Sequence, residues 1–216
     1  VNTGVDSGAD LNKDGLVGGP EDNYGHGEFP GQGGMVFLSQ LPIDEKNIRT
    51  FTDFKWDEVP ENNMVGRGFT KLERSAMPLH SRGMWDIPIQ SGRNQVHVIV
   101  THLNPIRDLG AESADRDRYL DQMSFLRDYL EGGEVGEFIV DDAGQSGGRN
   151  EDAAYVVAGQ LNADPAEERE QRRLLRDFAT YAPFRSQGAH EALDHSSAAA
   201  TTLEEQETLG EYEGER

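Results

Sequence analysis

Two apolar segments of the sequence end in polar side chains of the types that active sites use. The segment VHVIVTHLNP reaches His102, and the segment YVVAGQLNADP reaches Gln160 and Asn162. A histidine can gain or lose a proton near neutral pH, whereas an uncharged amide such as Gln160 cannot take a proton from water. We expect the three side chains to meet where two strands leave a sheet. The alternatives are a core histidine that donates to a backbone carbonyl and an asparagine that caps a turn.

A second group of oxygen-bearing residues lies near the N-terminus, in the stretch DLNKDGLVGGPE (residues 10–21). The stretch fits the calcium-loop pattern D-x-[DN]-x-[DN]-G-x5-E at every fixed position. The expected Ca²⁺ ligands are side-chain oxygens and one backbone carbonyl, from Asp10, Asn12, Asp14, Leu16 (carbonyl) and Glu21. The flanking sequences are not typical of helices, so an acidic loop without metal is the alternative. A closed oxygen cage leaves little room for substrate, and a bound Ca²⁺ would therefore be structural.

The composition is strongly acidic. The chain has 40 Asp and Glu against 20 Lys and Arg, for a net charge of -20, and only four of its residues are Lys. This excess predicts a solvated surface whose self-repulsion is screened by salt, and it suggests a halophilic source. Nucleic-acid binders usually carry a basic patch, and the sequence has none. The chain has no Cys, which excludes disulfides and thiolate chemistry.

The first residue is Val1, and no apolar signal segment or membrane-spanning stretch is found in the sequence. These features indicate either a processed chain or a fragment. Alternating apolar residues predict strands, and two helices are expected. One is an amphipathic helix that ends at a Gly pair, and the other begins at Asp164 as N-cap. Strands that alternate with helices indicate an α/β or α+β layered fold. The expected strands are 34–39, 49–56, 86–90, 95–103, 137–140 and 153–159, and the first helix spans 115–133.

The order of several motifs resembles the endonuclease/exonuclease/phosphatase superfamily. They are PGQGGMVFLSQLPI, RTFTDFKWDEVP, MWDIPI, VHVIVTHLNP, DQMSFLRDYL, IVDDAGQSGG and VVAGQLNADP. The sequence is most similar to a branch with an Asp/Gly-rich loop before the PGQ segment, which implies a secreted or cell-surface protein. The resemblance implies a four-layer α-β-β-α sandwich, incomplete at both ends of this chain. Residues 1–190 would form the domain, and residues 191–216 an acidic, mobile tail.

The resemblance also implies an activity. Members of the superfamily hydrolyse phosphate esters with a divalent metal, usually Mg²⁺. A carboxylate-activated water attacks in line, and a His and an Asn hold the phosphoryl oxygens. By position these two residues are His102 and Asn162, while Gln160 replaces the catalytic Asp of the motif G-D-x-N-A-D-P.

Other positions also depart from the family pattern. Gly-Met-Trp-Asp (83–86) stands where relatives have Ser-His-Trp-Asp, and Tyr-Leu-Asp-Gln (119–122) stands for Asn-His-Asp-Glu. The opening Asn and Glu motifs would precede Val1, and the closing Asp-Tyr and Ser-Asp-His motifs would follow Arg216.

Three interpretations of the function stay open. One is a phosphoesterase completed by residues outside this chain or in a partner. Another is a pseudoenzyme that acts as a calcium-stabilised binding module, and a plain calcium-binding adhesion module is the third. The substrate class and the oligomeric state are not predicted.

Overall fold

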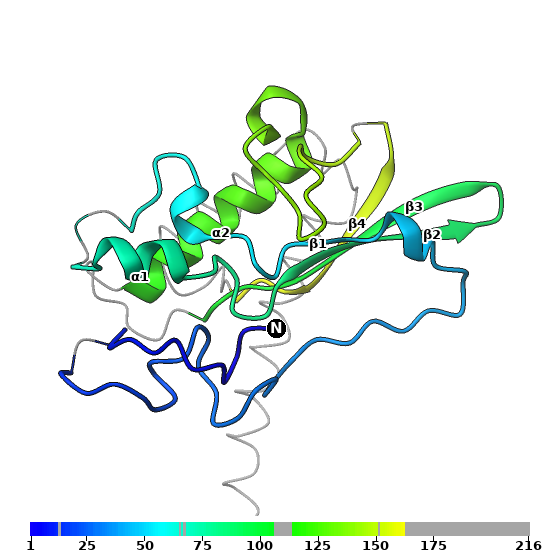
Figure 1. Cartoon of the computed structure of the whole chain (residues 1–216). Helices are drawn as coiled ribbons and strands as arrows, with labels where there is room; N and C mark the ends of the chain where they lie inside the picture. The colour runs from blue at the N-terminus through cyan, green and yellow to red at the C-terminus, as the bar shows by residue number, and fades with distance from the viewer. Residues whose placement is uncertain (13, 65, 67, 106–113, 151, 163–216) are drawn as a thin grey trace, which may run out of the picture. The chain divides into compact units, whose positions relative to one another are not determined.

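The computed structural model describes residues 1–12, 14–64, 66, 68–105, 114–150 and 152–162 (Figure 1). They belong to one compact unit, Val1–Asn162. The helix expected from Asp164, the domain boundary at 190 and the acidic tail 191–216 lie outside the described residues. No helix in the described part is both long and apolar enough to cross a membrane.

A four-stranded sheet forms the centre of this unit, in the order β1-β2-β3-β4. β1 pairs antiparallel with β2 and β2 antiparallel with β3, whereas β4 lies parallel to β3. The β2-β3 hairpin closes through a two-residue turn in which Gly92 has a φ of 62°, a conformation that glycine adopts without strain. The strands are β1 (Arg49–Thr50), β2 (Met84–Ser91), β3 (Asn94–His102) and β4 (Ala154–Gln160).

The long helix α2 (Ala114–Glu131) connects β3 to β4, because parallel strands need a long crossover. Gly132 follows α2 with a φ of 69° and ends it, as the sequence predicts. The short helix α1 (Lys71–Ala76) begins with a capping box between Thr70 and Glu73. Three 3₁₀ helices complete the helical elements of the described part: η1 (Glu45–Asn47), η2 (Trp56–Glu58) and η3 (Gly133–Gly136).

The core lies between α2 and the residues around β1 and β2. Phe51 packs edge-to-face against both Phe125 and Tyr129 of α2, with ring centroids 5.5 and 5.1 Å apart. These rings are fully buried, and so is Ile99 of β3. The mixed content of helices and one sheet confirms the expected α+β class, although a second sheet is not among the described residues.

The expected buried strand 34–39 is wrong. Its residues are extended but form no strand, and Val36 and Leu38 are 77% and 86% exposed. Figure 1 shows this blue segment running apart from the sheet until it meets the β2-β3 hairpin. A short continuous apolar run is consistent with a buried strand, but a strand also needs a neighbour for its N–H and C=O groups. In the part of the chain described, that neighbour is missing.

Two further strands are shorter than the sequence predicts. Only Arg49 and Thr50 of the segment 49–56 pair with β2. The segment 137–140 forms a single bridge between Val140 and Ser146. In both places the chain leaves the strand, and the segments around residues 49–53 and 141–142 bond to each other through polar side chains.

Candidate functional site

The ends of β3 and β4 bring two of the predicted site residues side by side. His102 is paired with Gln160 in the parallel register, and paired residues project from the same face of a sheet. The Leu103 N–H donates to the Gln160 carbonyl at 3.0 Å, which holds the two strand ends together. Asn162 follows two residues later, so all three predicted residues lie at this end of the sheet.

The side chains of Gln160 and Asn162 bind each other. Gln160 Nε2 donates to Asn162 Oδ1 at 2.5 Å, and Asn162 Nδ2 donates to the Leu103 carbonyl at 2.5 Å. The Asn162 backbone has a φ of 50°, a left-handed conformation that asparagine tolerates better than most residues. The two amides therefore form a neutral chain of hydrogen bonds that ends on β3.

A glycine makes this close approach of β4 to β3 possible. Gly159 has a φ of 127°, and a Cβ at this position would lie 1.9 Å from the Thr101 carbonyl oxygen. No other residue fits there without moving the backbone. Gly159 thus fixes the position from which Gln160 projects.

Two effects favour the neutral form of His102. Partial burial lowers its pKa below the usual value, and the positive charge of Arg82 lowers the pKa further. The Nε of Arg82 donates to the Gly33 carbonyl at 2.9 Å, so the N-terminal loop reaches this end of the sheet. A neutral imidazole here can donate one hydrogen bond from one ring nitrogen and accept one at the other.

A buried polar network that the sequence did not reveal lies behind the strand ends. Gln122 of α2 accepts from the Asn104 N–H at 2.8 Å and donates to Asn104 Oδ1 at 3.0 Å and to the Leu79 carbonyl at 2.8 Å. Ser81 Oγ also donates to Asn104 Oδ1, at 2.8 Å. An ionised glutamate at position 122 could not donate to these acceptors, so glutamine suits the network that is present.

Three other residues of the two motifs that depart from the family pattern hold the fold together. Met84 and Tyr119 are fully buried in the core. The Asp121 carboxylate accepts from Trp56 Nε1 at 2.6 Å and from the backbone and side chain of Asn63 at 2.8 and 2.6 Å. Burial raises the pKa of Asp121, and these hydrogen bonds oppose the rise. Its oxygens hold the segment around η2 against the helix.

The N-terminal acidic loop is curled by its own hydrogen bonds. The two Asp10 oxygens accept from the Asp14 and Gly15 N–H groups at 3.1 and 3.0 Å, and Asp14 Oδ1 accepts from the Leu16 N–H at 2.8 Å. Asn12 Oδ1 also accepts from the Asp14 N–H, at 3.0 Å. Glu21 Oε1 lies 3.7 Å from His26 Nδ1. Across the described ranges, no three His, Cys, Asp or Glu side chains gather as a metal site requires.

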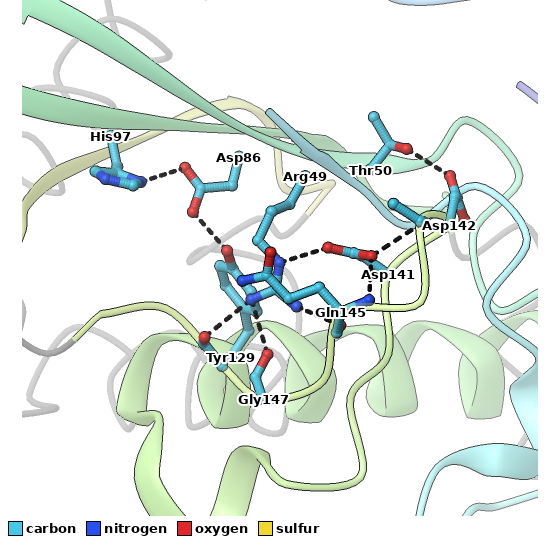
Figure 2. Close-up of polar contacts among 11 residues, drawn as sticks. Arg49, Thr50, Asp86, His97, Tyr129, Asp141, Asp142, Gln145 and Gly147 are labelled. Atoms are coloured by element: carbon cyan, nitrogen blue, oxygen red, sulfur yellow. Dashed lines mark hydrogen bonds and ion pairs between the residues drawn. The ribbon is translucent and has the colours of Figure 1, made fainter. Parts of the chain in front are cut away.

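Another cluster that the sequence analysis missed joins the sheet to α2 (Figure 2). His97 Nδ1 lies 2.7 Å from Asp86 Oδ1, and the Tyr129 hydroxyl donates to Asp86 Oδ2 at 2.5 Å. Asp86 is buried, and these two partners satisfy one hydrogen bond at each of its carboxyl oxygens. The three residues belong to β2, β3 and α2. In the sequence, the one sign of this cluster was the polar residue Asp86 within an apolar strand.

Next to this cluster, Arg49 holds the Gly-rich turn of residues 143–148 (Figure 2). Its Nε donates to Asp141 Oδ2 at 2.7 Å in a buried ion pair. Its other nitrogens donate to the carbonyls of Gln145, Gly147 and Gly148 at 2.8 to 2.9 Å. Just past β1, the backbone N–H groups of Thr52 and Asp53 donate to the Asp142 carboxylate at 2.9 Å, so these groups bond to Asp142 and not to β2.

A comparison with known proteins identifies the family of the chain. No curated protein and no solved structure gives a significant match. The family described as Endonuclease/Exonuclease/phosphatase matches residues 3–199, which is most of the chain. The match includes both strand ends and the Gly-rich turn. The chain therefore belongs to the endonuclease/exonuclease/phosphatase family.

Proposed function

We propose that this chain is a phosphoesterase-family domain whose capacity for hydrolysis is impaired. The family generally hydrolyses phosphate esters and generally depends on a divalent metal. The observation that carries the proposal is the neutral hydrogen-bond chain at the strand ends. By the resemblance, Gln160 stands at the position of the catalytic Asp, and its amide donates a hydrogen bond to Asn162.

The strand-end residues do not fit Mg²⁺. This small, hard cation is usually bound by one or two carboxylates together with waters and substrate phosphates. His102, Gln160 and Asn162 provide an imidazole and two amides, with no carboxylate. The Asp121 carboxylate accepts hydrogen bonds from Trp56 and Asn63 and serves the packing of α2. We therefore derive no catalytic step through a metal at this place.

The described residues can bind an anion more readily than they can activate water. Replacing a general base typically costs about 10²- to 10⁴-fold in rate. The neutral His102 can still donate a hydrogen bond to a phosphoryl oxygen. The domain would hold a phosphate ester and release it unchanged. A nucleic acid is a poor candidate for this ligand, because binding its many phosphates usually requires a basic patch and the sequence has none.

The second candidate function is a calcium-stabilised binding module. The curled loop of residues 10–16 supports this function, because three of its oxygen-bearing side chains already hold the loop backbone in a tight turn. Ca²⁺ would draw on the oxygens of Asp10, Asn12 and Asp14 together with the Leu16 carbonyl and Glu21. Its role would be to stabilise the fold, and the loop offers no chemistry for hydrolysis.

Hydrolysis tests the proposal directly. We would incubate the purified chain in molar salt with bis(p-nitrophenyl) phosphate and either Mg²⁺ or Mn²⁺, and measure the release of p-nitrophenol. We expect a rate near the uncatalysed background. The Gln160→Asp variant should restore little, because one carboxylate alone does not make a divalent-metal site. Robust metal-dependent hydrolysis by the unaltered chain would contradict the proposal.

A further inference from the structure

The hydrogen bonds at the strand ends have a fixed direction. The Leu103 carbonyl can only accept, so Asn162 must turn its NH₂ group toward it. The Oδ1 of Asn162 then faces Gln160, which must donate from its own NH₂ group. The chain of hydrogen bonds requires a donor at position 160, and an ionised carboxylate cannot supply one.

Asn162 also takes the place of a backbone group. The Leu103 N–H already donates to the Gln160 carbonyl. In a regular parallel ladder, the next bond would run from the backbone N–H of residue 162 to the Leu103 carbonyl. Here the side-chain Nδ2 of Asn162 makes that bond, while its backbone turns into the left-handed region. The side chain therefore extends the ladder by one step past the end of β4.

We propose that Gln160 and Asn162 form a latch that ties the end of β4 to β3 and fixes the orientation of both amides at the strand ends. Gln160 is the positioning residue of the latch, because its amide orients Asn162. This inference rests on the proposed function in taking Gln160 to stand where the family has its catalytic Asp. On this view glutamine at position 160 removes an acid and at the same time supplies the donor that the latch needs.

An acid at position 160 would oppose the latch. An ionised carboxylate would face Asn162 Oδ1, which places one acceptor against another. When protonated, the same carboxyl carries one O–H and can donate again. The latch therefore predicts an unusual pH profile for a Gln160→Glu variant, with greater relative stability in acid than at neutral pH.

A double-mutant cycle tests the coupling between the two residues. We would measure urea unfolding of Gln160→Ala, Asn162→Ala and the double variant. Each single change should raise the unfolding equilibrium constant about 5-fold, since one hydrogen bond contributes about that factor. The double variant should raise the unfolding equilibrium constant by only about 5- to 10-fold, because either change breaks the same pair of linked hydrogen bonds. An additive result of about 25-fold would overturn the latch.

The pH profile of Gln160→Glu is the second measurement. The matched control is Gln40→Glu, since Gln40 is exposed and its side chain bonds to no residue in the described part of the structure. Relative to this control, Gln160→Glu should lose stability at pH 8 and recover it near pH 4. Parallel profiles for the two variants would refute the inference. Hydrolysis by the unaltered chain would overturn the proposed function alone and would leave both results intact.

Discussion

The buried histidine His80 gives a prediction whose size can be worked from the structure. The side chain is fully buried, and neither ring nitrogen has a hydrogen-bond partner in the described part of the chain. Its ring lies edge-on to Phe125, with centroids 5.3 Å apart. Burial lowers the pKa of His80 from 6.5 to about 3, and the positive charge of Arg118 adds to the effect. The folded protein therefore holds this imidazole neutral.

The sign of the pH effect follows from the lowered pKa. The unfolded chain takes up a proton on His80 near pH 6.5, but the folded chain does so only near pH 3. The free energy of unfolding therefore has its full value, as far as His80 is concerned, above pH 6.5, and it decreases as the pH falls toward 3. One pKa unit corresponds to about 1.4 kcal/mol, so the 1.5 units between pH 6.5 and pH 5 amount to about 2 kcal/mol.

The His80→Leu variant removes this titration. At pH 8 its stability should equal or exceed that of the unaltered chain, because a buried polar group without a partner is replaced by an apolar one. At pH 5 the variant should gain about a further 2 kcal/mol relative to the unaltered chain. We would measure both proteins by urea unfolding at pH 8, 6.5 and 5 in constant salt.

The control for this experiment is Gln40→Leu, because Gln40 is exposed and neither side chain carries a titratable group. Its difference from the unaltered chain should not change with pH. If the difference between His80→Leu and the unaltered chain were also constant from pH 8 to pH 5, the reasoning about His80 would be refuted.

Four further predictions follow from the charges and contacts of the described residues. Arg49→Ala should lower the free energy of unfolding by about 3 to 5 kcal/mol, because Asp141 would be left buried without its partner; a loss below about 1 kcal/mol in urea unfolding would contradict this. Ca²⁺ should raise the melting temperature by mass action, and Asp10→Ala or Glu21→Ala should abolish the rise. A melting curve of the unaltered chain that ignores Ca²⁺ would exclude the calcium loop. The net charge of -20 predicts a melting temperature that rises from low to molar salt, and a flat or falling curve would show that the acidic excess is incidental. Val36→Lys should reduce self-association in light scattering and leave the melting temperature unchanged, because Val36 lies exposed in an extended, uncharged segment. Unaltered scattering would count against that reading of the segment.

The sequence by itself determined the features that depend on near neighbours along the chain. The expected strands 86–90 and 95–103 correspond to β2 and β3, and the amphipathic pattern with its terminal glycines predicted α2. The motif order also predicted the family, which the match over residues 3–199 confirms. The resemblance also predicted that Gln160 stands where the family has an acid.

Only the tertiary structure decided which partner each polar or apolar group meets. The segment 34–39 has the apolar run of a buried strand but no neighbouring strand among the described residues, and Val36 and Leu38 stay exposed. The partners of Asp86 and Gln122 come from other elements of the fold, and spacing within one segment cannot reveal them. The same holds for Gln160, whose role as a donor depends on the carbonyl of Leu103 on the adjacent strand. Periodicity records which face of an element is buried, but the direction of a hydrogen bond depends on the atom opposite, and folding alone brings that atom into place.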